Sequence, residues 1–108
     1  MGVISIYRAV GVDEYYSIID TGQFSCHPRM ADVKYFALDF AETLEYASKS
    51  YNQDVVAIFE VVLRDEDLKI LGDFTFVDPS IFKSGTVVIH AEDLDMFNNS
   101  AISVSLKV

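Results

Sequence analysis

The sequence is short of several residue types, and each shortage excludes a class of protein. It has no tryptophan, two prolines, five glycines and a single cysteine among 108 residues. The cysteine, Cys26, cannot form a disulfide within the chain, which suits a reducing compartment. No apolar run approaches the roughly 20 residues that a membrane-spanning helix needs, and no basic segment with a cleavage site opens the sequence. We therefore expect a cytoplasmic protein with no membrane partner.

Basic residues are also scarce. The chain has eight Lys and Arg but 17 Asp and Glu, so its formal net charge is −9. This charge opposes the phosphates of DNA, RNA and anionic membranes, which argues against direct binding of nucleic acid. Acidic clusters of this kind either solvate a surface or dock a basic protein partner, and the sequence leaves both open. The candidate docking residues are Asp65, Glu66, Asp67, Asp73, Glu92, Asp93 and Asp95.

Recognisable catalytic and metal-binding motifs are lacking as well. The two histidines, His27 and His90, are far apart, and Cys26 has no second ligand at a metal-binding spacing, so we predict no metal site. The sequence has no glycine-rich phosphate loop and no G-x-S-x-G motif. The Cys26-His27 pair could suggest a thiol and its base, but adjacent side chains rarely point at each other, so an incidental pair is the better interpretation. His90 is best explained as a structural residue at a strand end.

Apolar and aromatic residues are plentiful: 51% of the chain is hydrophobic, with eight Phe and six Tyr. This is enough for one core, so residues 1–108 should form a single domain. The pattern predicts an α+β fold, with a mostly antiparallel sheet of about six strands, in one sheet or divided between two, and two helices in the N-terminal half. The expected strands are 3–10, 34–38, 55–63, 68–77 with a bulge at Gly72, 86–90 and 101–108; the expected helices are 12–21 and the one capped by Asp39 and Glu42, with an irregular loop at 23–33, a turn at 65–67 and a helical turn at 92–97.

Arg8 stands out because it lies in the otherwise apolar strand at 3–10. Side chains alternate along a strand, so Arg8 shares a face with Ile6 and Val10. A guanidinium keeps its proton, and burying it unpaired is costly, so it requires a partner. Glu60, the lone charge in the strand at 55–63, is the natural candidate for an ion pair. The alternative is an anionic ligand such as a phosphate.

A family resemblance rests on several short segments of the sequence. They are Tyr7-Arg8, Gly22 after a short helix, Lys34-Tyr35-Phe36-Ala37, the helix carrying Ala41 and Tyr46-Ala47, and Val87 to Leu94 with Phe97-Asn98. Their order resembles the ADP-ribosyltransferase fold of small bacterial toxin domains. The resemblance covers most of the chain.

The resemblance implies a set of NAD-binding residues, but one residue that the family uses for catalysis is missing from this sequence. Arg8 matches the arginine that grips NAD, and Tyr35 or Phe36 matches the residue that frames the nicotinamide. The family's third element is a glutamate entering the strand that here begins near Gly85, and this sequence has no carboxylate there. Glu60 and Glu92 are poor replacements. If the chain is an enzyme, its catalytic candidates are Arg8, Tyr35 and Glu60, and its cofactor is NAD, held by Arg8, Tyr35 and Phe36.

Two functional hypotheses follow, with a generic interaction or regulatory module as a third. The first is a non-catalytic acidic binding protein without a cofactor. By size and charge it is similar to bacterial immunity proteins, antitoxins that neutralise a toxin, above all a basic nuclease, by direct docking. The second is an NAD-dependent ADP-ribosyltransferase-like enzyme or toxin domain. The missing glutamate and the charge of −9 favour the first.

Overall fold

The computed structural model describes residues 2–25, 33–49, 54–76 and 78–107, which form six strands, four α-helices and one 3₁₀ turn. The strands are β1 (Val3–Val10), β2 (Val33–Ala37), β3 (Ala57–Arg64), β4 (Gly72–Thr75), β5 (Thr86–His90) and β6 (Ser103–Leu106). The helices are α1 (Val12–Thr21), α2 (Phe40–Ser48), α3 (Asp65–Leu71) and α4 (Leu94–Ser100), with the 3₁₀ turn η2 (Ala91–Asp93) just before α4.

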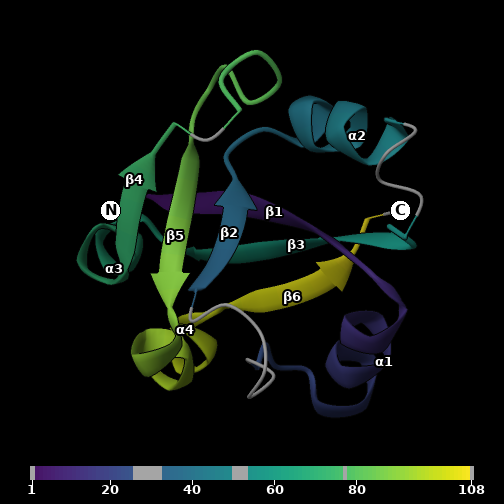
Figure 1. Cartoon of the computed structure of the whole chain (residues 1–108). Coiled ribbons are helices and arrows are strands. Elements are labelled where there is room, and N and C mark those ends of the chain that lie inside the picture. The colour runs from purple at the N-terminus through teal and green to yellow at the C-terminus, as the bar shows by residue number, and fades with distance from the viewer. Residues whose placement is uncertain (1, 26–32, 50–53, 77, 108) are drawn as a thin grey trace.

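The strands form one antiparallel sheet in the order β4-β5-β2-β1-β3-β6 (Figure 1). The predicted α+β class with a six-stranded antiparallel sheet is therefore confirmed. The two helices expected in the N-terminal half are α1 and α2. Two more, α3 and α4, lie in the C-terminal half, so the helix count is higher than predicted.

The main core lies on one face of the sheet, under α1, α3 and α4. Ile6 and Val10 of β1 point to this face, and their register partners Val61 and Ala57 on β3 do the same. Each helix adds apolar side chains to the core, among them Ile18, Leu68 and Phe97. The other face carries α2 and the 78–85 loop, where Tyr46 packs against Phe82 in a smaller cluster.

The structure corrects the prediction for residues 65–77. The three acids expected to form a turn instead open helix α3, where their negative charges favour the N-terminal end of the helix dipole. Leu68 and Leu71, three residues apart, are both buried by that helix. Gly72 is no bulge: it ends α3 and begins β4 in close contact with β5, since a Cβ there would lie 2.4 Å from Cγ2 of Val87. Strand β4 is therefore only four residues long.

Elsewhere the predicted elements agree with the structure to within a few residues. Asp39 caps α2 as expected, because its carboxylate accepts a hydrogen bond of 3.0 Å from the backbone N–H of Glu42. The expected strand at 101–108 is the shorter β6 at the edge of the sheet, and two of its alternating apolar residues, Ile102 and Leu106, are exposed. Most of the loop expected at 23–33 lies outside the described residues, as do Cys26 and His27.

Candidate functional site

The sheet is nearly divided between β1 and β2. Strand β1 pairs with β3 along its whole length and β2 pairs with β5 likewise, but β1 and β2 share the single register pair Tyr7 and Ala37. Beyond that pair, toward Val10, the two strands diverge. Arg8 crosses the gap, and its Nη1 donates a hydrogen bond of 3.0 Å to the carbonyl oxygen of Tyr35. A side chain thus supplies a link where the backbone ladder stops.

Glu14 of α1 holds the two diverging strands together from the core side. Its carboxylate accepts hydrogen bonds from Nε and Nη2 of Arg8 at 2.6 and 2.9 Å. It also lies 3.5 Å from Nζ of Lys34 on β2. Burial acts to raise the pKa of Glu14, but the hydrogen bonds and positive charge of Arg8, aided by Lys34, outweigh it and hold the pKa below its ordinary value of 4.5. Glu14 is therefore ionised at neutral pH and joins a cation on each strand.

The predicted ion pair between Arg8 and Glu60 is therefore wrong. In the register of β1 and β3, Glu60 lies opposite Tyr7, whereas Arg8 lies opposite Phe59. Directly opposed residues share a face, so Arg8 and Glu60 point to opposite sides of the sheet. Glu60 instead accepts a hydrogen bond of 3.2 Å from the hydroxyl of Tyr7. Desolvation, helped by the charge of Glu60 and this hydrogen bond, raises the pKa of Tyr7.

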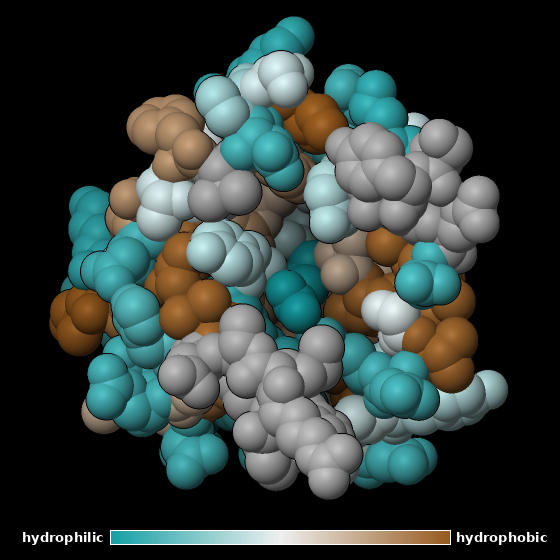
Figure 2. Space-filling model, viewed as in Figure 1, coloured by the Kyte–Doolittle hydropathy of each residue, from teal (hydrophilic) through white to brown (hydrophobic). Residues whose placement is uncertain are grey.

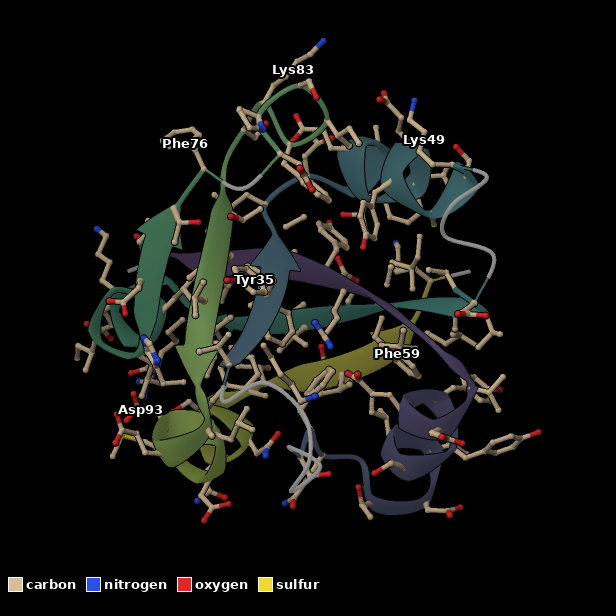
Figure 3. The ribbon with its side chains drawn as sticks, viewed as in Figure 1. Tyr35, Lys49, Phe59, Phe76, Lys83 and Asp93 are labelled. Atoms are coloured by element: carbon tan, nitrogen blue, oxygen red, sulfur yellow. The ribbon has the colours of Figure 1, made fainter. Side chains whose placement is uncertain are left out.

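The gap between β1 and β2 opens into a cavity of about 240 Å³, the Arg8 cleft. Figure 2 shows this hollow near the centre of the molecule, with hydrophilic atoms at its base. Tyr35, labelled in Figure 3, projects from β2 and is 45% exposed. The predicted NAD-contacting residues Arg8, Tyr35 and Phe36 all line the cleft, but Glu60 does not. The other lining residues are Tyr7, Ala9, Ala37, Thr43, Tyr46, Asp78, Phe82 and Thr86.

Sequence reasoning missed the wall of the cleft that comes from α2 and the 78–85 loop. The three-residue spacing of Thr43 and Tyr46 places them on one face of the predicted helix, but nothing in the sequence says what that face meets. Asp78 is a carboxylate on the rim of the cleft. It adopts φ 49°, a left-handed conformation that Asp tolerates, and its carbonyl accepts hydrogen bonds from the backbone of Ile81 and Phe82. This turn places Phe82 against Tyr46.

The size and chemistry of the cleft limit what it can hold. Pockets for whole cofactors are usually about 300–1,000 Å³, so about 240 Å³ suits one aromatic ring with a polar substituent. The tyrosines and Phe82 offer stacking surfaces, and Asp78 offers a carboxylate. Two nitrogens of the Arg8 guanidinium are already bound to Glu14, so the cleft does not present a free arginine to a diphosphate.

The seven predicted docking acids lie on α3, β4, η2 and α4, at one side of the sheet, which we call the acidic end. Helix α3 packs against β4 and α4, and α4 packs against β5. Figure 1 shows α3 and β4 on the outer side of β5 and α4 at the end of β5, and Asp93 is labelled beside α4 in Figure 3. Tertiary structure thus brings the acids of α3 and those that begin at Glu92, 25 positions after Asp67 in the sequence, onto neighbouring helices.

Four of the seven acids already have partners within the chain. Asp67 and Glu66 lie 3.1 and 4.0 Å from Arg64, and Asp65 lies 3.3 Å from Lys69. Asp73 pairs with His90 at 2.5 Å, which gives His90 a structural contact. In the described part of the chain, the other three acids make no ion pair and carry the uncompensated charge of the acidic end. They are Glu92, Asp93 and Asp95.

Large apolar side chains are exposed on α3 and α4 and along β4. Ile70 on α3 is 78% exposed and Met96 on α4 is 59% exposed. On and just after the edge strand β4, Phe74 and Phe76 are 53% and 72% exposed, and Figure 3 shows Phe76 pointing away from the sheet. The acidic end therefore offers both charge and apolar surface to a partner.

The described ranges contain neither a cluster of metal-binding side chains nor a membrane-spanning helix. Within 2–25, 33–49, 54–76 and 78–107, no group of three or more His, Cys, Asp or Glu could hold a metal ion. None of the helices in those ranges is long and apolar enough to cross a membrane. In comparisons with known proteins, no protein-family model, curated protein or solved structure matches this chain.

Proposed function

We propose that this chain is a non-catalytic binding protein whose acidic end docks onto a basic protein. The observation that carries the proposal is the clustering of Glu92, Asp93 and Asp95, without ion-pair partners among the described residues, with Ile70 and Met96 exposed on the two helices α3 and α4 that pack together there. Stable interfaces combine an apolar centre with a polar rim, and charge of one sign attracts a partner of the other. A bacterial toxin, above all a basic nuclease, is the class of partner that this surface suits best.

The charge of the acidic end would act mainly on the rate of association. Electrostatic attraction can raise the association rate of two proteins by one to three orders of magnitude at low salt, and salt screens it. An inhibitor that must capture a toxin before the toxin reaches nucleic acid benefits from a fast encounter. The exposed apolar residues would then slow dissociation, because they are buried in the complex.

The test measures binding of a basic nuclease toxin domain encoded beside this gene. Changing Glu92, Asp93 and Asp95 to Lys should slow association at least tenfold at low salt and flatten its salt dependence. Each substitution replaces a negative charge with a positive one and so raises the net charge by two, and the three substitutions together take it from −9 to −3. A control with Asp13, Asp20 and Asp54 changed to Lys has the same net charge but leaves the acidic end intact.

The control separates a specific surface from net charge alone. We expect the control to associate several times faster than the acidic-end variant, and the nuclease activity of the toxin to be blocked by the wild-type chain. Equal slowing by both variants would mean that total charge, not the acidic end, governs binding. A salt-independent association rate, or no inhibition of the toxin, would refute the proposal.

A second candidate function is supported by the meeting of Arg8, Tyr35 and Phe36 in one cleft, as the ADP-ribosyltransferase resemblance implies. The described residues fit the nicotinamide ring of NAD but not the whole dinucleotide, because the cleft is small and Glu14 occupies the Arg8 guanidinium. Calorimetry with nicotinamide and with NAD tests this candidate. Binding that Tyr35→Ala abolishes would support it, and no heat with either compound would reject it.

A further inference from the structure

Helix α1 carries apolar residues on two sides but buries only one of them. At 100° per residue, Tyr15 and Ile18 lie toward the core, and both pack there. Val12, Tyr16 and Ile19 follow one another at spacings of four and three and form a second stripe. This second stripe is exposed: Val12 by 51%, Tyr16 by 61% and Ile19 by 53%.

Val12 and Tyr16 line a groove of about 300 Å³ between α1 and the sheet, which we call the α1 groove. Ile19 continues the exposed stripe along α1 outside the groove. Val56, just before β3, and Leu106, at the end of the edge strand β6, form the other wall of the groove and are about half exposed. Tyr15 lies in the floor, with its ring 5.3 Å from that of Tyr16 and 6.1 Å from that of Phe59. Figure 3 labels Phe59 in this region, close to α1, on the side of the molecule away from the acidic end.

The charges around the α1 groove are mainly negative. Asp13 and Asp20 lie on α1 about 80–100° from Val12, immediately beside the apolar stripe. Asp54 adjoins the start of the helix, where its carbonyl oxygen lies 3.4 Å from the position of a Cβ on Gly11. All three acids are exposed. A second copy of this chain would bring the same acids, and another charge of −9, against this surface.

We infer that the α1 groove binds an amphipathic helix of another protein, with apolar residues along one side and lysine or arginine beside them. The apolar residues of that helix would cover Val12, Tyr16 and Ile19, in the manner of other helices that lie in apolar grooves. Its cations would face Asp13 and Asp20. The inference is independent of the proposed function, because none of the acidic-end residues contributes to the α1 groove.

The test uses a designed helical peptide as the probe. The peptide has leucine at positions i, i+4, i+7 and i+11 and lysine or alanine elsewhere; the control peptide has the same composition with the leucines spread around the helix. Titration into the full-length ¹⁵N-labelled chain should shift the amide signals of α1, Val56 and Leu106. The patterned peptide should bind at least about tenfold more tightly than its control, because the control cannot bury its leucines together.

Two surface variants identify which surface of the chain binds the patterned peptide. Tyr16→Ser with Ile19→Ser should weaken the patterned peptide about tenfold or more, whereas Ile70→Ser with Met96→Ser, a matched apolar loss at the acidic end, should change the affinity less than twofold. All four side chains are exposed, so both variants should fold. Equal affinity for the two peptides, equal effects of the two variants, or concentration-dependent dimerisation through α1 without peptide would each overturn the inference. None of these outcomes bears on capture of a toxin by the acidic end.

Discussion

Replacing Glu14 with glutamine should destabilise the fold, because its carboxylate joins cations on two strands that scarcely pair. The change removes the ionic component of two hydrogen bonds from Arg8, at 2.6 and 2.9 Å, and of the 3.5 Å contact with Lys34. Hydrogen bonds to charged groups contribute about 1.5–3 kcal/mol each, and a buried charge left without its partner costs more. The side chains of Arg8 and Glu14 are about one-fifth exposed, so solvent reduces the effect to about 2 kcal/mol in total.

Thermal unfolding followed by circular dichroism measures this loss. About 2 kcal/mol should lower the midpoint by roughly 8 °C in a domain of this size. A glutamine variant that unfolds within about 1 °C of the wild type would refute the reasoning. The double variant Arg8→Gln with Glu14→Gln supplies the coupling: it should lose at least about 1 kcal/mol less than the sum of the two single changes, because each single change already breaks the same pair.

The stabilisation by Glu14 should depend on pH in one direction. Its pKa in the folded chain is below the ordinary 4.5, so the folded state releases this proton more readily than the unfolded state. The contribution of Glu14 is therefore complete above the unfolded pKa and is lost as the pH falls through the folded pKa. The difference in stability between wild type and Glu14→Gln should shrink below about pH 4.5, and a difference that grows there would contradict the ion pair.

Three smaller predictions test other parts of the fold. Gly72→Ala should destabilise by about 2 kcal/mol or more in urea unfolding, because its Cβ would lie 2.4 Å from Cγ2 of the fully buried Val87; unchanged stability would mean that β4 can move away from β5. Asp39→Ala should cost about 1 kcal/mol by removing the cap of α2, and Asp39→Asn should restore most of it. Tyr7→Phe should cost about 1 kcal/mol at neutral pH by removing the hydrogen bond to Glu60. Because the pKa of Tyr7 is raised in the folded chain, its contribution is present below the unfolded pKa of about 10 and is lost as the pH rises, so the Phe variant should lose less stability than the wild type in alkaline solution.

The local pattern of apolar and polar residues was sufficient to predict most of the helices and strands. The apolar strands, the cap at Asp39 and the class of the fold could all be predicted because alternation and helical spacing act over a few residues. The prediction for residues 65–77 was wrong for a physical reason. Leu68 and Leu71 lie on a helix and are buried, and glycine is needed at position 72 because β5 lies too close for a side chain. Both conditions depend on neighbours distant in sequence.

The candidate sites divide in the same way. The sequence by itself determined that the chain is acidic, that Arg8 lies on the core face of the first strand, and that a charge there requires a partner. Only the tertiary structure decided that the partner is Glu14, that residues from β1, β2, α2 and the 78–85 loop enclose one cleft, and that α1 leaves an apolar stripe uncovered. Side-chain periodicity fixes the face on which a residue lies, but strand order and register decide what that face meets.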